Sequence, residues 1–187
     1  YDSAGRTTSV RPAPFSWDNP NDYEEVTNSA QVSYSYNAQN LLEKITTLTS
    51  EYTFSYDGFG NTASVEIGGS EIISYDYNSY NGKLKTVTYA SGFIVKYTYD
   101  NLENLSEVWY NDGGEDYLAY KYLYNAYGQI YCFENHLSGT NIIYDYDASN
   151  RLIGYTEYGE EDMVNHLAVT YSYDDYSRVQ FIRYSFD

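Results

Sequence analysis

The sequence predicts an all-β protein, an antiparallel meander of repeated β-hairpins. Three observations support this prediction. The pattern Tyr-x-Tyr followed by Asp or Asn recurs along the 187 residues, turn-forming residues return about every 10 to 12 residues, and helical periodicity never lasts beyond a turn or two. We expect about 14 strands from Tyr34 onward. A twisted sheet of more than about ten strands curls or splits, so we also expect the sheet to be strongly curved or spiralling.

The pattern occurs in eight copies. From Tyr34 onward, successive copies begin 20 to 27 residues apart, so one copy is about two strands long. The start of a ninth copy is predicted at "YSFD", from Tyr184 to Asp187, which gives a single YD-repeat β-domain over residues 1–187. The eight copies begin at Tyr1, Tyr34, Phe54, Tyr75, Tyr97, Tyr122, Tyr144 and Tyr171.

The first strand of each copy carries the aromatic pair. Side chains alternate along a strand, so both rings lie on one face, where neighbouring strands can stack them into cross-strand ladders. Tyrosine, present 27 times, therefore replaces an aliphatic core. The structural residues predicted in this position are Tyr34, Tyr36, Tyr56, Tyr75, Tyr77, Tyr97, Tyr99, Tyr122, Tyr124, Tyr144, Tyr146, Tyr171 and Tyr173.

A turn follows the aromatic pair. The Asp or Asn side chain caps backbone N–H groups, and Gly or Asn three residues later tolerates the left-handed conformation of a type I turn with a bulge. Glu103 and Ser177 depart from this pattern, and Asn104, one residue late, predicts a lengthened turn in its copy. The structural turn residues predicted here are Asp57, Gly60, Asp100, Gly128, Asp147 and Asp174.

The returning strand carries two apolar residues three positions apart, for example Leu42 with Ile45 and Leu105 with Val108. This spacing would place them on opposite faces of a regular strand. We therefore expect either a bulge between them or burial of both faces.

A second class of turn separates the copies. Two segments, near 11–30 and 158–166, interrupt the regular spacing of the turns. The first holds Trp17 and all three prolines and is expected to plug or cover an edge of the sheet. The second is expected to be an acidic loop. The second-class turns are predicted at Gly68-Gly69, Ser91-Gly92, Asp112 to Gly114, Ser138-Gly139 and Tyr158-Gly159.

The charge balance restricts the partners. With 27 acidic and 10 basic residues, the net charge is -17, which disfavours nucleic acid and anionic membranes. The chain starts without Met and shows neither a secretory apolar region nor a long apolar run, so we expect it to be a piece of a larger protein. Cys132 is interpreted as an ordinary strand cysteine.

No residue set for catalysis is evident. His136 and His166 have no Cys or His at ligand spacing, and known nucleophile, zinc and phosphate-loop motifs are absent. The pair Asp174 and Asp175 is better explained by turn capping than by Ca²⁺ binding. We predict no enzyme activity, no catalytic, cofactor-binding or metal residue, and no cofactor.

Carbohydrate binding is the alternative function. Tyrosine faces pack on the apolar side of a sugar ring, and nearby Asp and Asn hold its hydroxyl groups. Strand ladders explain the same rings, so we favour the structural interpretation and assign no glycan-binding residue.

The unit Tyr-x-Tyr-Asp-x-x-Gly-Arg-Leu resembles the YD repeat of the Rhs family, which includes bacterial Rhs and wall-associated proteins, toxin-complex proteins and teneurins. The resemblance covers most of the chain. The Gly-Arg pair is kept at Gly5-Arg6, whereas Asn150-Arg151 and Ser177-Arg178 keep only the arginine. Neither the conserved closing core of the bacterial members nor their Asp-Pro self-cleavage motif is found, so the resemblance does not imply autoproteolysis.

The resemblance implies a β-ribbon that spirals into a hollow shell around a C-terminal effector. On this basis we expect a non-catalytic scaffold segment of a secreted or cell-surface protein, associated with a bacterial cell wall. The expected partners are neighbouring repeats of the same parent protein, other copies that pair edge to edge through unsatisfied terminal strands, and, under the alternative, a cell-surface glycan.

Overall fold

The computed structural model describes residues 1–10, 31–159 and 165–186. Every helix-or-strand element in these residues is a β-strand, which confirms the all-β prediction. Accordingly, these residues contain no helix that could cross a membrane. The predicted excursion near 11–30, with Trp17, lies outside the described residues.

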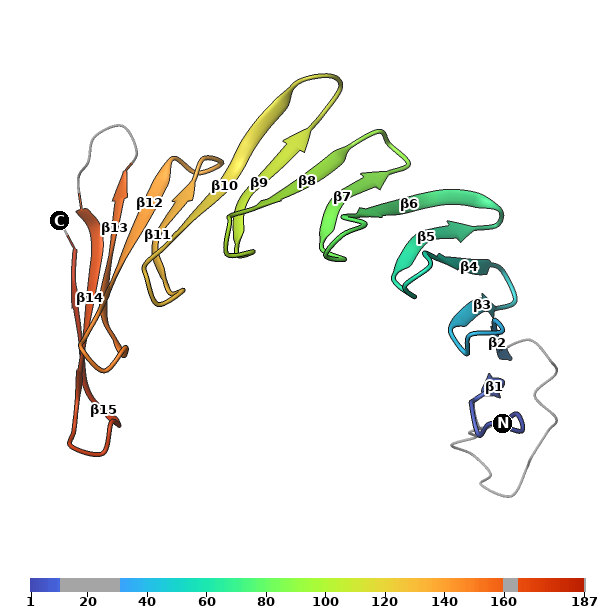
Figure 1. Ribbon diagram of the computed structural model, residues 1–187, viewed down its shortest axis with the longest axis horizontal. Coiled ribbons are helices and arrows are strands. Elements are labelled where there is room, and N and C mark those ends of the chain that lie inside the picture. Colours follow the sequence, from blue (N-terminus) through green and yellow to red (C-terminus); the bar gives the residue numbers. More distant parts are fainter. Residues whose placement is uncertain (11–30, 160–164, 187) are drawn as a thin grey trace, which may run out of the picture. The chain divides into compact units, whose positions relative to one another are not determined.

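Contacts divide the chain into two units. In the first unit, Tyr1–Gly92, seven strands lie side by side in sequence order, and each pairs antiparallel with the next (Figure 1). They are β1 (Ser9–Val10), β2 (Val32–Tyr36), β3 (Leu42–Thr46), β4 (Glu51–Tyr56), β5 (Thr62–Ile67), β6 (Ser70–Tyr77) and β7 (Leu84–Tyr89).

The second unit, Phe93–Asp187, repeats the arrangement. Its eight strands also follow one another in sequence order as antiparallel neighbours. They are β8 (Ile94–Tyr99), β9 (Leu105–Asn111), β10 (Asp116–Tyr124), β11 (Ile130–Asn135), β12 (Thr140–Tyr146), β13 (Leu152–Gly159), β14 (Asn165–Tyr173) and β15 (Val179–Ser185). The meander is therefore confirmed within each unit, whereas the curvature of the whole sheet stays a prediction.

A β-bulge explains the spacing of three in the returning strands. In the β2–β3 hairpin, Tyr36 lies opposite Leu42 and Tyr34 lies opposite Ile45, with a register shift between the two pairs. The extra residue brings both apolar side chains to the face that carries the tyrosines. The same shift precedes the second aromatic residue in the β4–β5, β6–β7, β8–β9, β10–β11, β12–β13 and β14–β15 hairpins, which confirms the first of the two expected explanations.

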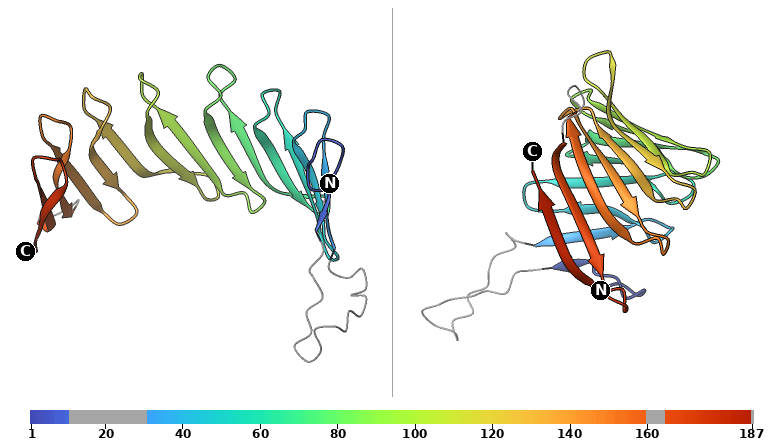
Figure 2. Two further views of the ribbon diagram at one scale, coloured as in Figure 1. Left: turned by 90° about the horizontal axis from the view of Figure 1, so that it is seen from below. Right: turned by 90° about the vertical axis from the view of Figure 1, so that its left-hand side faces the viewer.

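Each unit is a single layer of strands (Figure 2). We call the face with the aromatic pairs and their apolar partners the aromatic face, and the opposite face the polar face. No second layer of described residues covers either face, so few side chains are fully enclosed. Among the described residues, the buried hydrophobic side chains are Val87, Ala119, Cys132 and Val169.

Ring contacts run across strands on the aromatic face. In the second unit the Phe133 ring lies 5.7 Å from the Tyr120 ring and 5.1 Å from the Tyr122 ring, and Tyr144 faces Tyr155 at 6.1 Å. Such pairs stabilise a sheet by about 0.2 to 1 kcal/mol each. Cross-strand ring pairs are therefore one source of stability on the aromatic face.

Two predicted boundaries differ in the structure. Tyr158 and Gly159 were expected in a turn, but they continue β13, where Gly159 lies opposite Thr140. The second boundary is the ninth copy predicted at Tyr184. In the structure, Tyr184 lies on β15 opposite Val169. This stretch thus occupies the returning strand of the eighth copy, whereas in the other copies the aromatic pair lies on the outgoing strand.

Candidate functional site

The feature that recurs most regularly is the turn after each aromatic pair, which we call the YD turn. Asp57 Oδ1 accepts hydrogen bonds from the backbone N–H groups of Phe59 and Asn61, both at 2.9 Å. The Gly60 N–H donates to the Asp57 carbonyl at 3.1 Å, and the Asp57 N–H donates to the Asn61 carbonyl at 2.9 Å. The side chain and backbone of one residue therefore close the whole turn.

The fourth residue of the YD turn is left-handed in every copy of standard length. Gly60 and Gly128 have φ of 88° and 77°. Glu103 (φ 67°) and Ser177 (φ 61°) take the same conformation. The lengthened turn predicted at Asp100 is therefore wrong, because an ordinary side chain accepts the left-handed geometry there. The longer turn lies in the copy at Asn78, whose N–H donates to the carbonyl of Lys83, one residue further along than in the other copies.

The capping carboxylates are stabilised in their charged form. Hydrogen bonds lower the pKa of Asp57, first through the Asn61 side chain, and that of Asp147, first through the backbone N–H of Arg151. Asn37 caps its turn through the same two backbone contacts without a charge. The acceptor oxygen, rather than the charge, is thus the common requirement.

In six copies, a hydrogen bond from the second tyrosine of the pair connects the copy to the preceding one. The Tyr56 hydroxyl donates to the backbone carbonyl of Leu42 at 2.5 Å, and the Tyr124 hydroxyl donates to that of Leu105 at 2.8 Å. We call this contact the tyrosine bridge; it also joins Tyr36 to Thr7, Tyr77 to Thr62, Tyr146 to Ile130 and Tyr173 to Leu152. Burial raises the pKa of Tyr56 and Tyr124, so these hydroxyls remain donors to a higher pH than an exposed tyrosine does.

The residue after the left-handed position of the YD turn contacts the following copy, whereas the tyrosine bridge contacts the preceding one. Arg151 Nε donates to Asp147 Oδ2 at 2.7 Å, while Nη1 reaches Ser177 Oγ at 3.1 Å and the guanidinium carbon lies 4.5 Å from the centre of the Tyr173 ring. Arg151 therefore pairs within its own turn and stacks on the next copy at the same time.

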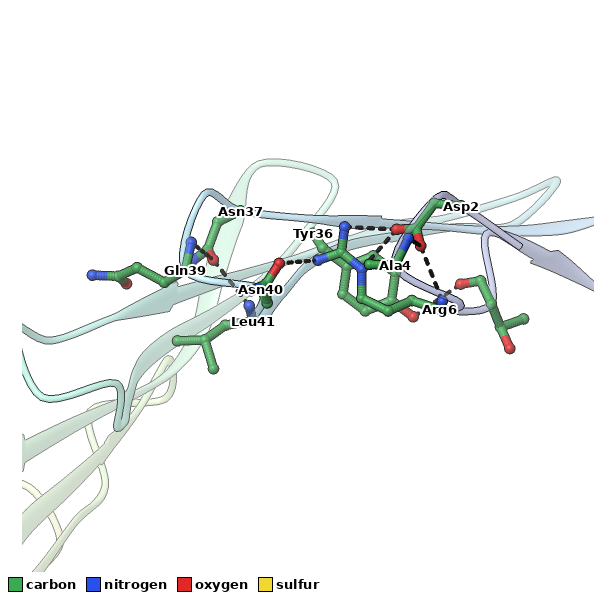
Figure 3. Close-up of polar contacts among 9 residues, drawn as sticks. Asp2, Ala4, Arg6, Tyr36, Asn37, Gln39, Asn40 and Leu41 are labelled. Atoms are coloured by element: carbon green, nitrogen blue, oxygen red, sulfur yellow. Dashed lines mark hydrogen bonds and ion pairs between the residues drawn. The ribbon is translucent and has the colours of Figure 1, made fainter.

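Arg6 repeats this arrangement at the start of the chain. It pairs with Asp2, donates to Asn40 Oδ1 at 2.8 Å, and lies 4.4 Å from the centre of the Tyr36 ring (Figure 3). Gln129 makes a comparable link by donating to the Asn150 carbonyl at 2.9 Å. In the sequence, the Gly-Arg pair served only as a mark of the family; the long polar side chains Arg6, Gln129 and Arg151 after the left-handed position were the available signal for a contact with the next turn.

The predicted structural residues thus have two distinct positions. The first tyrosines, such as Tyr122 and Tyr144, contact rings and apolar side chains on the aromatic face. The second tyrosines Tyr36, Tyr56, Tyr77, Tyr124, Tyr146 and Tyr173 form the bridges. By strand register, Tyr75, Tyr97, Tyr99 and Tyr171 lie on the same face. Asp57, Asp100, Asp147 and Asp174 cap their turns, and Gly60 and Gly128 take the left-handed position.

The potentially reactive side chains do not converge. His136 Nε2 lies 3.4 Å from Glu134 Oε2. Cys132 is buried, and burial raises the pKa of its thiol. Among the side chains that the structure describes, no three metal-ligating groups gather into a metal-binding cluster. His166 lies on β14, but its side chain is not described.

A hollow of about 310 Å³ opens on the aromatic face of the second unit. Its wall includes Phe93 and Tyr110, whose rings stack at 6.0 Å, and Tyr110 also stacks on Tyr117 at 5.4 Å. The remaining lining residues are Val95, Val108, Ala119, Tyr120 and Leu137. The accessible wall is apolar, which suits hydrocarbon groups better than sugar hydroxyls.

Comparison with known proteins finds solved structures with a similar fold. No curated protein matches the sequence. A crystal structure of TcdB2-TccC3, and another without the hypervariable C-terminal region, are each 17% identical with a TM-score of 0.69, covering 83% of this chain and 9% of theirs. The Tc holotoxin pore of Photorhabdus luminescens is 15% identical with a TM-score of 0.52, covering 84% of this chain and 11% of that one.

At these identities the likeness shows the fold, and this chain spans only 9% to 12% of the length of the similar chains. The sequence itself gives the family. A family model described as Teneurin YD-shell matches residues 1–186, which is nearly the full length. The protein therefore belongs to the Teneurin YD-shell family, as the repeat pattern predicted.

Proposed function

We propose that this chain is a non-catalytic wall segment of a β-shell, within a larger secreted or cell-surface protein, and that its aromatic face lines the space in which an effector polypeptide is enclosed. The separation of the two faces carries the proposal. The aromatic pairs and their apolar cross-strand partners occupy one face of the single layer, and the cross-strand ion pairs occupy the other. A sheet of this kind is stable where one face meets water and the other is sheltered.

The ion pairs illustrate the polar face. Lys96 Nζ lies 2.6 Å from Asp116 Oδ2, and Lys44 Nζ lies 2.9 Å from Glu51 Oε1. These side chains are partly exposed, so each pair stabilises the sheet by about 1 kcal/mol or less. Their main consequence is solubility: this face suits the outside of a shell.

Neighbouring residues on one strand provide a direct test. Lys44 and Ile45 are adjacent on β3 and point to opposite faces, because Ile45 lies opposite Tyr34 and Lys44 lies opposite Ser35. In the full-length parent protein, K44C is expected to react rapidly with a bulky, membrane-impermeant maleimide, whereas I45C reacts only after denaturation. In the isolated chain both variants are expected to react. Equal labelling of the two variants in the intact parent protein would contradict the proposal.

The expected partner along the sheet is another strand at β15. All residues of β15 are exposed, and no further strand among the described residues pairs with its outer edge. Such an edge offers unpaired N–H and C=O groups to an added strand. We infer that the next segment of the parent protein pairs here, and that isolated chains associate edge to edge. Light scattering that shows a strict monomer at high concentration would contradict the association.

A further inference from the structure

The turn that joins β6 to β7 (Figure 1) contains a pair of residues that the other YD turns lack. Asn81 and Gly82 form the single Asn-Gly sequence in the 187 residues, and both are exposed. This is also the longer YD turn, closed by the bond from the Asn78 N–H to the Lys83 carbonyl. The YD turns of the other copies form without an Asn-Gly sequence, so capping does not explain the pair.

An Asn-Gly sequence is reactive because the glycine nitrogen can attack the asparagine side chain. The attack closes a five-membered ring within one chain, which needs no second molecule to be brought into place. At most sequences the side chain of the following residue obstructs the approach. Gly82 has no side chain, and open space surrounds the point where its Cβ would lie. The attacking nitrogen is therefore unobstructed.

A hydrogen bond holds the Asn81 side chain close to the same peptide bond. The Lys83 N–H donates to Asn81 Oδ1 at 3.1 Å, which is the contact of an Asx turn. This contact folds the side chain back toward the peptide bond between Asn81 and Gly82. It also directs a backbone donor at the oxygen on which negative charge develops when Cγ is attacked, as the donors of an oxyanion hole do.

Two other turns show which features the reaction needs. Asn37 makes the same contact to the N–H two residues further on, but Ala38 follows it and presents a Cβ to the attack. Asp57 also makes the contact and is followed by Gly58, but its side chain is an ionised carboxylate at neutral pH, which is a poor electrophile. Asn81 combines the amide, the glycine and the contact.

One further contact slows the reaction without preventing it. The Gly82 N–H donates to the Asn78 carbonyl at 2.8 Å, and the nitrogen must release this proton in order to attack. The reaction therefore proceeds when this bond is open, and hydrogen bonds in exposed turns open at little cost in free energy. Because the nitrogen must lose a proton to base, the rate rises with pH.

We propose that Asn81 is a site of spontaneous modification, at which the protein releases ammonia and acquires an aspartyl or isoaspartyl residue. The Gly82 nitrogen gives its proton to solvent base and bonds to Asn81 Cγ. The bond from Cγ to Nδ2 then breaks, and ammonia leaves with a proton from water. The product is a cyclic succinimide.

Water opens this ring in either of two ways. Attack at Cγ breaks the bond from Cγ to the Gly82 nitrogen and gives aspartate. Attack at the main-chain carbonyl carbon of residue 81 breaks its bond to the same nitrogen and gives isoaspartate, whose main chain runs through Cβ and Cγ. The balance needs only water. In the isoaspartyl form the closure from Asn78 to Lys83 has to span one more methylene group, so the modification changes the β6–β7 turn and goes beyond the enclosing role.

Mass spectrometry tests the proposal on the folded, full-length parent protein. Samples aged at mildly alkaline pH are digested at acidic pH and compared with a fresh sample. We expect the peptide that contains Asn81 to gain one dalton and to separate into two forms, one of which accepts a methyl group from an isoaspartate-specific methyltransferase. The gain should be faster at higher pH. G82A should slow it roughly tenfold or more by raising the barrier to ring closure, and N81Q should abolish it, because the ring would have six members.

Asn37 and Asn125 are matched internal controls, because both make the same contact and are followed by alanine; they should keep their amides. The proposal is overturned if Asn81 keeps its amide, or if either control converts as fast as Asn81. It is also overturned if G82A converts as fast as the wild type, or if conversion occurs only in protein unfolded by denaturant. None of these outcomes bears on the labelling of K44C and I45C, so the shell function is tested separately.

Discussion

The Tyr124 hydroxyl donates a hydrogen bond of 2.8 Å to the backbone carbonyl of Leu105, 19 residues earlier in the chain. Leu105 is the first residue of the returning strand of the preceding copy. The same pair of positions is joined for Tyr36, Tyr56, Tyr77, Tyr146 and Tyr173 as well. Tyrosine is therefore required at the second aromatic position for its oxygen as well as for its ring.

Removing that oxygen should destabilise the second unit. Y124F keeps the ring but leaves the part-buried Leu105 carbonyl without this donor, which we expect to lower the free energy of unfolding by about 1 to 2 kcal/mol. Chemical denaturation followed by circular dichroism measures the change. The control is Y127F, two residues after the cap in the same copy, where an exposed hydroxyl is lost. If Y127F lowered the free energy of unfolding as much as Y124F, loss of the tyrosine bridge would not be the cause of the destabilisation.

Arg151 and Arg178 form a natural comparison for the contacts between copies. Both pair with the carboxylate four residues earlier, at 2.7 Å, but only Arg151 also reaches the next copy, while Arg178 lies 5.2 Å from its own Tyr176 ring. We expect R151M to lower the free energy of unfolding by about 1 kcal/mol more than R178M, because it also loses the ring contact and the bond to Ser177. If thermal melts showed an equal loss of stability for R151M and R178M, this prediction would be contradicted.

Acid should loosen the YD turns. The pKa of Asp57 is lower in the folded protein than its ordinary value of 3.8, chiefly through the hydrogen bond from the Asn61 side chain. A lowered folded pKa stabilises the fold above the unfolded pKa, and this contribution is lost as the pH falls through the folded pKa. We expect the melting temperature to fall below about pH 4.

Asn37 shows how to isolate this effect, because it caps its turn without a charge. In D57N the cap is retained and the ionisation is removed. The difference in melting temperature between the wild type and D57N should therefore narrow as the pH is lowered from 7 to 3. A difference that stays constant over this range would rule out the Asp57 carboxylate as a source of the acid sensitivity.

Substitutions at the left-handed position of the YD turn should destabilise the protein to different, predictable extents. Gly128 has φ of 77°, and open space surrounds the point where a Cβ would lie, so only the backbone conformation restricts substitution. Asn takes this conformation at Asn40 and Asn150. We expect G128N to cost a few tenths of a kcal/mol and G128V about 2 kcal/mol. Equal unfolding midpoints for the two variants would indicate that the turn changes its geometry on substitution.

The periodic part of the fold could be predicted because each local signal is short-range. Asp57 and Gly60 define a turn by their spacing alone, and the spacing of Leu42 and Ile45 already pointed to a bulge. Glu103 shows the limit of this reasoning: its residue type argued for a longer turn, but the neighbouring hairpins fix the turn length and impose a positive φ. Tertiary context overrides the local preference there.

Contacts between copies were not predictable from the pattern. Aligning the copies gives the position of the turn in each hairpin. It does not give the register between the last strand of one hairpin and the first strand of the next. Without that register, neither the carbonyl that receives the Tyr56 hydroxyl nor the reach of Arg151 toward Ser177 could be assigned. Side-chain exposure was also not predicted from the sequence: Tyr80 is 97% exposed, whereas Tyr77, three residues earlier, bridges to Thr62.

Contacts among the described strands join only those that are consecutive in the sequence. A chain organised in this way can order itself like a zipper, adding one hairpin at a time to any copy that has already formed. The entropy lost in closing each loop stays small, because no strand has to wait for a distant partner. A sheet of this kind can be assembled progressively as the polypeptide emerges from a ribosome.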